Sequence, residues 1–393
     1  MNSIFRTTPK YQRAEAELRL GYFSHRCDQI VSTIRDLAEI ESPSDNKAAV
    51  DRVAQAIANK FARLGGKIRI HQAKGFGNHL QVDFSGTSAG KPVLLLGHYD
   101  TVYPLGTLAK MPCHIVDNKL TGPGVLDMKS GIALMLHAIA GLQEWHGALP
   151  RPVTVLLVSD EEVGSDSSRA ITESLAKKAA AVLVLEPSYG RHGAVKTARK
   201  GVGEYLVKVT GKASHAGLDF EKGANAILEL ARQIEKVSAF TDLKKGLTVN
   251  VGIVSGGSRT NVVPAEATAQ VDVRIARVKD AAEIDKQMRS LRPFNRKCKI
   301  EISGGINRPP MERSSGIAAL YAQASAIARE SGWKLGEAAV GGGSDGNFTA
   351  GLGIPTLDGL GGVGDGAHAT HEHILISELP RRAALLAGLI EAV

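Results

Sequence analysis

Five segments of this 393-residue chain place histidine and carboxylate side chains at short spacing. His98 and Asp100 stand two residues apart in GHYDT, and Asp127 lies within GPGVLDMKSG. SDEEVGS contains three consecutive acids at 160–162, and Glu186 precedes a proline. Near the end, the glycine-rich GGVGDGAHATHEHI contains His368, His371 and His373. A set of histidines and carboxylates without cysteine is typical of catalytic metal sites.

Carboxylates that gather at one place repel one another, and a pair of divalent cations is the simplest way to relieve that repulsion. Zinc suits these side chains, and cobalt or manganese could occupy the same site. Two ions that share one carboxylate would lie about 3.5–4 Å apart and could hold a hydroxide between them. The residues therefore predict a site for two zinc ions per chain.

Continuous apolar runs precede three of these segments, at 93–96, 153–158 and 182–185. Such runs are typical of strands buried on both faces of a mostly parallel sheet, and apolar residues at helical spacing lie between them. Ligands of an open α/β sheet bind outside the carboxyl ends of its strands. Taken singly, His98 could be a surface histidine or one with its hydrogen bonds satisfied, the acids a solvated turn, and Glu186 a strand end. Their shared position after buried strands favours the metal site.

The pattern changes between Lys200 and Pro309. Residues 265–275 alternate between apolar and polar, which is typical of an antiparallel sheet with one covered face. Strands and helices in this region follow the order strand, helix, strand, strand, helix, strand, which is the ferredoxin-like arrangement. We therefore expect a catalytic α/β domain, residues 1–198 and 311–393, with an inserted domain at 199–310. The two crossings between the domains would form a hinge, so the inserted domain could act as a lid.

The net charge of +8 comes from 48 basic and 40 acidic residues that are spread along the chain. Without a basic run or a known motif, binding to nucleic acid is not expected, although anionic substrates are weakly favoured. The three cysteines lie far apart, and an odd count suits a reducing compartment. We find neither a secretory signal nor an apolar run of membrane-spanning length, and expect a cytoplasmic protein with no membrane partner.

In this order, the motifs resemble those of the zinc-dependent superfamily of glutamate carboxypeptidase (carboxypeptidase G), aminoacylase, acetylornithine deacetylase and succinyl-diaminopimelate desuccinylase. The resemblance implies that His98, Asp127 and Glu186 hold one metal ion. It also implies that Asp127, Glu162 and His368 hold the other, with Asp127 as the bridge. His368 is chosen over His371 and His373 because the family's last ligand stands four residues before a glutamate.

Three further roles follow from the same resemblance. Glu161 would be the general base that moves a proton from the attacking water to the leaving nitrogen. Asp100 would hydrogen-bond His98 and fix its tautomer. In KASHAG, His215 resembles a residue that reaches into the partner subunit's active site and stabilises the oxyanion, which implies a homodimer. The family also implies a cis peptide bond between Asp127 and Met128.

Substrate recognition is expected to rest on residues from several motifs, namely Asn261 in TNVVPA, Arg274 in VDVRI, Arg308 in NRPPM, and Gly343 and Ser344 in GGGSDGN. The planar fork of arginine suits a substrate carboxylate, although either arginine could be a structural ion-pair partner instead. Desuccinylase-like members have threonine and arginine where this chain has Gly343 and Asn347. That difference argues against diaminopimelate chemistry.

The leading hypothesis is cleavage of an amide to release a C-terminal or N-acylated amino acid with a free carboxylate, such as glutamate. The glutamate at position 186, where many relatives have aspartate, favours the carboxypeptidase branch modestly. One alternative is an N-acyl-amino-acid or aryl-amide hydrolase whose acyl side sets specificity. A non-catalytic metal-binding relative would have a damaged base or ligand, and a purely structural dimerisation protein would bind no zinc. Both disagree with the intact motifs.

Overall fold

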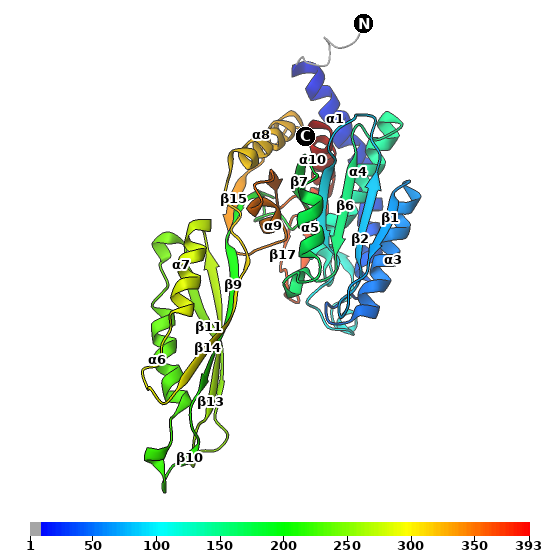
Figure 1. Cartoon of the computed structure of the whole chain (residues 1–393). Helices are drawn as coiled ribbons and strands as arrows, with labels where there is room; N and C mark the ends of the chain where they lie inside the picture. The colour runs from blue at the N-terminus through cyan, green and yellow to red at the C-terminus, as the bar shows by residue number, and fades with distance from the viewer. Residues whose placement is uncertain (1–8) are drawn as a thin grey trace. The chain divides into compact units, whose positions relative to one another are not determined.

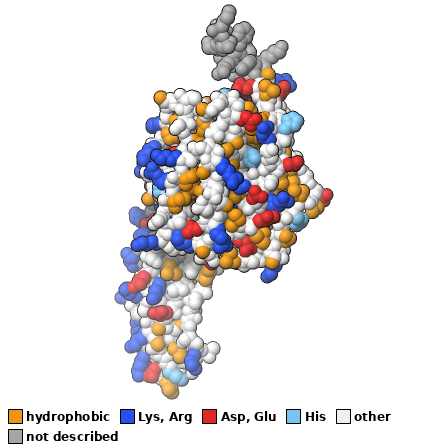
Figure 2. All heavy atoms as spheres, turned by 90° about the vertical axis from the view of Figure 1, so that its right-hand side faces the viewer, with side chains coloured by type: hydrophobic (Ala, Val, Ile, Leu, Met, Phe, Trp, Pro, Cys, Tyr) orange, Lys and Arg blue, Asp and Glu red, His pale blue; other side chains and the backbone are white. Residues whose placement is uncertain are grey.

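The computed structural model describes residues 9–393, which divide into two compact units (Figure 1). The first unit consists of residues up to Thr197 together with Arg313–Ala339 and Ser344–Val393. The second unit consists of Ala198–Glu312 and Val340–Gly343. Lys, Arg, Asp and Glu side chains are interspersed over the face that Figure 2 shows.

A six-stranded sheet forms the centre of the first unit, in the order β1-β2-β6-β3-β7-β16. The strands are β1 (Lys67–His71), β2 (His79–Phe84), β3 (Val93–His98), β6 (Val153–Val158), β7 (Ala181–Val184) and β16 (Thr356–Leu357). Strands β6, β3, β7 and β16 are parallel neighbours, whereas β2 pairs antiparallel with both β1 and β6. The expected mixed, mostly parallel sheet is confirmed.

Helices cover both faces of this sheet. They are α1 (Pro9–His25), α2 (Cys27–Ala38), α3 (Lys47–Arg63), α4 (Ser130–His146), α5 (Arg169–Ala176), α8 (Ser315–Glu330), α9 (Gly346–Gly351) and α10 (Leu379–Ala392). Successive residues of β3 enter different cores, because side chains alternate across a strand. Val93 and Leu95 pack in the larger core with α2, α3, α4 and α10, whereas Leu94 and Leu96 pack in a smaller one near α5.

The segment that contains α4 corrects one expectation. Residues Val125–His146 are long and apolar enough to cross a membrane, although no run of that kind was expected from the sequence. In the structure, 83% of the most apolar stretch of 18 residues within this segment is buried inside the protein. Helix α4 packs against α10 and α2, so its apolar composition is that of a core helix.

Shorter elements complete the first unit. A small antiparallel sheet contains, in order, β17 (Gly364–Asp365), β18 (His373–Leu375), β5 (Lys119–Thr121) and β4 (His114–Val116). A further pair of strands consists of β8 (Val195–Arg199) and β15 (Glu337–Val340), each of which begins in the first unit and ends in the second. Single turns of 3₁₀ helix lie at Thr107–Ala109, Glu161–Val163, Phe220–Lys222, Leu243–Lys245 and Ile376–Glu378, of which the third and fourth belong to the second unit.

The second unit is a four-stranded antiparallel sheet in the order β11-β13-β9-β14. Its elements are β9 (Gly201–Thr210), α6 (Ala226–Ser238), β11 (Thr248–Gly256), β13 (Glu266–Ile275), α7 (Val278–Arg289) and β14 (Lys299–Arg308). The expected alternation in β13 is confirmed, since Ala267, Ala269, Val271 and Val273 are all buried. These side chains pack with residues of α6 and α7. A two-stranded pair, β10 (Ser214–His215) and β12 (Val262–Val263), completes the unit.

Candidate metal centre and active site

The six residues expected to hold and use the metal ions all belong to the first unit. They stand at the end of β3 (His98), in the turn before α4 (Asp127), after β6 (Glu161 and Glu162), after β7 (Glu186) and between β17 and β18 (His368). Because β3, β6 and β7 are parallel neighbours, their carboxyl ends meet at the same edge of the sheet.

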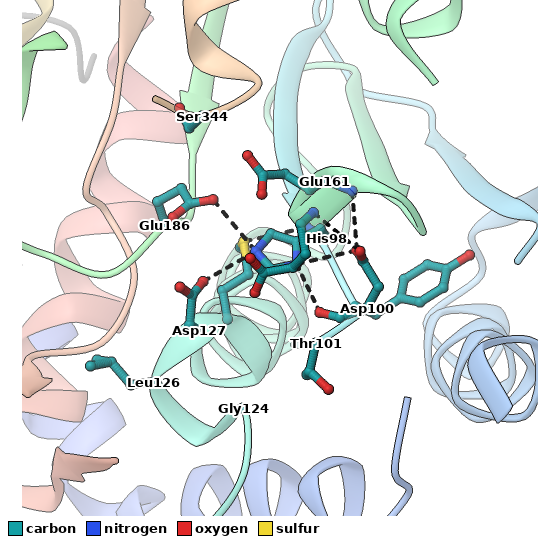
Figure 3. A network of polar contacts seen from close by, with 12 residues as sticks. His98, Asp100, Thr101, Gly124, Leu126, Asp127, Glu161, Glu186 and Ser344 are labelled. Atoms are coloured by element: carbon teal, nitrogen blue, oxygen red, sulfur yellow. Dashed lines mark hydrogen bonds and ion pairs between the residues drawn. The ribbon is translucent and has the colours of Figure 1, made fainter. Parts of the chain in front are cut away.

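Asp127 lies between two histidines, His98 and His368, of which Figure 3 labels His98. One of its carboxylate oxygens, Oδ1, is 3.1 Å from Nε2 of His98. The other, Oδ2, is 3.4 Å from Nε2 of His368. His98 Nε2 is also 3.5 Å from Oε1 of Glu186, and His368 Nε2 is 3.1 Å from Oε2 of Glu162. The five side chains therefore form one continuous cluster in which the Asp127 carboxylate occupies the middle.

Two overlapping groups in this cluster have donor atoms that lie within 4.8 Å of one another. One group is His98, Asp127 and Glu162, and the other is His98, Glu161 and Glu186. Glu161 was expected to act as a base beside the ligands. A carboxylate oxygen of Glu161 lies within 4.8 Å of donor atoms of His98 and Glu186, so Glu161 forms part of the wall of the same site.

The charges of the cluster compensate one another in pairs. Burial opposes the charged form of His98, but hydrogen bonds with Asp100 and Asp127 raise the pKa of this imidazole well above its ordinary value. Hydrogen bonds with Asp127 and Glu162 raise the pKa of His368 to about 10. Although burial acts in the opposite direction, hydrogen bonds from the two histidines lower the pKa of Asp127. Protonated imidazoles thus supply the positive charge that these carboxylates require.

The donor set fits divalent metal ions. A metal ion would take over the compensating charge and leave both imidazoles neutral, which is the form in which histidine binds metal. Imidazole and carboxylate are the ligands of catalytic zinc, and none of the three cysteines belongs to the cluster. The residues present therefore match the metal class expected from the sequence.

Asp100 connects His98 to the acidic turn. Its backbone carbonyl lies 3.0 Å from Nδ1 of His98, and its carboxylate oxygen Oδ1 lies 3.4 Å from the same atom. The carboxylate accepts hydrogen bonds from the backbone N–H groups of Glu161 (3.3 Å) and Glu162 (3.2 Å). Ser44 donates a further hydrogen bond of 2.8 Å to it. The ring orientation of His98 and the position of the two glutamates thus depend on one fully buried residue.

Glu372 has a role that reasoning from the sequence missed. Its carboxylate is fully buried and accepts hydrogen bonds from the backbone N–H groups of Gly124, Leu126 and Asp127, at 2.8, 2.8 and 2.9 Å. It therefore holds the turn that carries Asp127. Its spacing from His368 was the one available signal, whereas no pattern pointed to Ser44. The peptide bond between Asp127 and Met128 is cis, which confirms that expectation.

His215 and Asn261 lie close together in the second unit. His215 is exposed on β10, and its Nδ1 accepts hydrogen bonds of 3.1 Å from the backbone N–H groups of Gly217 and Leu218. Asn261 is also exposed, and its carbonyl accepts the N–H of Ala216 at 2.9 Å. The KASHAG and TNVVPA motifs are therefore neighbours within this unit.

The remaining expected substrate ligands are in contact with other groups of the protein. Arg274 forms an ion pair of 2.8 Å with Asp272. In this structure Arg274 therefore has an ion-pair partner within the protein, which was the alternative to binding a substrate carboxylate. The side chain of Arg308 is almost entirely buried, and its Nη1 lies 3.3 Å from the side-chain oxygen of Asn307.

The GGGSDGN segment crosses between the two units. The carbonyl of Gly343, in the second unit, accepts a hydrogen bond of 3.2 Å from Arg199. Ser344, in the first unit, is fully buried and donates a 2.6 Å hydrogen bond to Asp358. Its backbone N–H donates to the side chain of Asn347 at 2.9 Å. The hydroxyl of Ser344 therefore helps to fold this segment.

Comparison with known proteins decides the family. A family model described as peptidase family M20/M25/M40 matches residues 94–392, about three quarters of the chain. The chain belongs to this family. Membership of peptidase family M20/M25/M40 confirms the resemblance read from the motifs and the expected enzyme class, a zinc-dependent hydrolase. A peptidase acts on peptide or other amide bonds, so the substrate is an amide.

Individual relatives agree with this assignment. Carboxypeptidase G2 of Pseudomonas sp. (strain RS-16) is 32% identical over 370 residues, which cover 92% of this chain and 88% of that protein. Among solved structures, aminopeptidase PepT of Bacillus cereus has a TM-score of 0.75 at 24% identity, covering 93% of this chain and 98% of that one. Bacillus subtilis YxeP, described as a dinuclear metal-binding peptidase, has a TM-score of 0.68 at 15% identity and covers 94% and 98%. At these identities, the solved structures show a shared fold.

Proposed function

We propose that this chain is a two-metal amidohydrolase that releases an amino acid with a free carboxylate, such as glutamate, from a peptide or an N-acyl derivative. One observation carries the proposal. The two oxygens of Asp127 face two different histidines, at 3.1 and 3.4 Å, as a carboxylate shared by two ions requires. The 32% identity to a carboxypeptidase G2 supports this branch of the family.

The proposed ligands divide into two sets that share Asp127. His98, Asp127 and Glu186 would hold one ion, and Asp127, Glu162 and His368 the other. Zinc is favoured over cobalt or manganese, because the set combines imidazole with carboxylate. When bound, the ions would polarise the scissile carbonyl and lower the pKa of a water molecule at the site. The description of YxeP as dinuclear supports a pair of ions.

Glu161 is the proposed general base. Its carboxylate would take a proton from the attacking water as the new C–O bond forms, and would deliver that proton to the amide nitrogen as the C–N bond breaks. The products are then a carboxylic acid and an amine. Asp100 would keep His98 in the orientation and tautomer needed for ligation, since both its carbonyl and its carboxylate face Nδ1.

The second unit is proposed to act as a dimerisation and lid domain. His215 would reach the active site of the partner subunit in a homodimer and stabilise the oxyanion that develops on the scissile carbonyl. Its exposed position and the KASHAG motif support this role. A hinge at the chain crossings between the units would let the site close on substrate.

Substrate recognition would rest on Asn261, Arg274 and Arg308, together with Gly343 and Ser344, with an arginine as the partner of a substrate carboxylate. Arginine can donate two parallel hydrogen bonds to a carboxylate. Arg274 would have to exchange its ion pair with Asp272 for the substrate, whereas the side chain of Arg308 is almost entirely buried. We also propose a cytoplasmic location, which the three free cysteines support.

Hydrolysis of a panel of amides tests the substrate class. The zinc-loaded protein would be incubated with N-acyl glutamate, N-acyl aspartate and N-acetylornithine, and the released amino acid measured. The proposal predicts the highest kcat/KM for acyl-glutamate. Rates that follow the acyl group and ignore the amino acid would favour the alternative, an N-acyl or aryl-amide hydrolase.

A further inference from the structure

One face of the small sheet formed by β17, β18, β5 and β4 collects basic side chains. In β5, Leu120 is fully buried, whereas its neighbours Lys119 and Thr121 are not. In β18, Ile374 is fully buried and pairs with Leu120, so His373 lies on the other face. Because side chains alternate across a strand, Lys119, Thr121 and His373 share the outer face of the sheet.

His114 extends this face across the next strand. In the pairing register, Thr121 is opposite His114 on one side and opposite His373 on the other. Nδ1 of His114 lies 2.8 Å from the hydroxyl of Thr121, while Nδ1 of His373 lies 2.9 Å from the carbonyl of His371. A carbonyl accepts only, so Nδ1 of His373 carries the hydrogen and Nε2 is left for other contacts.

A cavity of about 390 Å³ opens over this face. Five basic side chains line it, namely Lys110, His114, Lys119, His371 and His373. No acid stands among the described residues that line it. Within residues 9–393, the ammonium groups of Lys110 and Lys119 form no ion pair. Asp365 of β17 is opposite His373 in the pairing register. Its carboxylate accepts the N–H of Gly366.

We propose that this cavity binds a small anion with at least two negative charges, such as a dicarboxylate or a tricarboxylate. The lysines supply fixed positive charge, and the imidazoles add charge when they are protonated. Positive charges gathered in a concave site repel one another. A bound anion would relieve this repulsion. The cavity is at the small end of the range for ligand pockets, so the ligand is a small molecule.

The anion could come from two sources with the same chemistry. It is either the acidic end of a substrate or a free metabolite that acts as an effector. His371 belongs to the loop that also carries His368 and stands three positions after it, so an anion held here would contact the same loop as a proposed metal ligand. Binding of the anion can be measured without turnover, so this proposal can be tested separately from the proposed hydrolase activity.

Binding of tricarballylate to the metal-loaded protein tests the proposal by isothermal titration calorimetry. This tricarboxylate lacks the hydroxyl group that makes citrate a strong chelator. The double variant K110Q/K119Q should bind it at least about tenfold more weakly than the wild type. K91Q, which changes an exposed lysine that does not line the cavity, should bind it as the wild type does. Thermal unfolding would show that each variant is folded.

Two results would overturn the proposal. In one, the wild type fails to bind tricarballylate, and in the other, K110Q/K119Q binds it as well as the wild type, which would place the anion at the metal centre. If binding is lost as expected, hydrolysis identifies the source. If K110Q/K119Q raises KM only for substrates that have an acidic acyl end, the cavity is a substrate subsite. An unchanged KM would identify it as an effector site.

Discussion

The carboxylate of Glu372 accepts the backbone N–H of Asp127 at 2.9 Å, so a residue outside the proposed ligand set holds the proposed bridging ligand in place. The same carboxylate holds Gly124 and Leu126. Replacing Glu372 with Gln removes the negative charge. One of the two acceptor oxygens becomes an NH₂ group, which cannot accept hydrogen bonds from the backbone N–H groups. We expect metal affinity and kcat to fall by about 10–100-fold. Metal content after dialysis and steady-state kinetics would measure both.

Glu229 provides a matched control for that variant. It is also a buried glutamate, and it accepts the backbone N–H groups of Phe294 and Asn295 at 3.0 and 2.8 Å, but it belongs to the second unit. Glu229→Gln should lower the free energy of unfolding and leave metal affinity unchanged. Equal metal loss in both variants would mean that Glu372 acts through general stability.

Arg382 should be a major source of stability for the loops around the site. Its guanidinium is almost fully buried and donates to the carbonyls of Gly361 (2.9 Å), Gly193 (3.0 Å) and Gly359. Gly361 in turn donates its N–H to the carbonyl of Glu186 at 2.8 Å. Arg382→Met leaves these carbonyls without the donor, which should cost about 3 kcal/mol or more of unfolding free energy.

Denaturant unfolding would measure that cost. The exposed Arg329 of α8 is the comparison, because Arg329→Met should change the free energy of unfolding by less than about 0.5 kcal/mol. If the two variants are equally stable, the carbonyls around Arg382 are satisfied in another way.

His137 should make stability depend on pH. Burial, together with the charge of Lys60, lowers the pKa of His137 to about 4, and its Nε2 lies 3.0 Å from the hydroxyl of Thr33. In the unfolded chain, the imidazole titrates near 6.5. Between these values the unfolded state binds more protons, so unfolding free energy falls as pH falls from 6.5 to 4 and is unaffected above 6.5.

The size of that effect can be isolated by substitution. One pKa unit corresponds to about 1.4 kcal/mol, so the loss should reach roughly 2 kcal/mol after allowance for partial exposure. His137→Gln should flatten this part of the pH profile of unfolding. Parallel profiles for the wild type and the variant would show that His137 binds its proton as readily in the folded protein as in the unfolded chain.

Removal of metal should destabilise the first unit. Without cations, the carboxylates of Asp127, Glu162 and Glu186 gather around two histidines, which are their only positive partners in the cluster. A ligand present at about 100 times its Kd stabilises the folded state by about 2.7 kcal/mol, so chelation should lower Tm and zinc should restore it. Identical melting curves with and without chelator would contradict metal binding at this cluster.

The parts of the fold that could be predicted are those that carry a continuous sequence pattern. Strands β3, β6 and β7 consist mainly of apolar residues, and β13 alternates between apolar and polar residues. The small sheet was not predicted, because its strands have two or three residues and β18 pairs with β5 from a distant part of the chain. Short strands of this kind are defined by their partners and not by their own residues.

The candidate site divides in a similar way. Metal-binding residues could be proposed because their chemistry is visible in the side chain and each follows a strand or a glycine-rich turn. Glu372 and Ser44 act by binding backbone N–H groups or another side chain, which residue type and spacing do not reveal. The pairing of Arg274 with Asp272 had a signal, since residues two apart in a strand share a face.

Metal content and turnover of Glu161→Ala, measured beside the wild type, test the central claim most directly. The account predicts two equivalents of zinc per chain in both proteins and a fall in kcat of about 10²–10⁴-fold in the variant, because a general base is lost while the ligands remain. Loss of metal together with turnover would make Glu161 a ligand, as its distance from His98 and Glu186 allows. Retained turnover would contradict its role in the reaction.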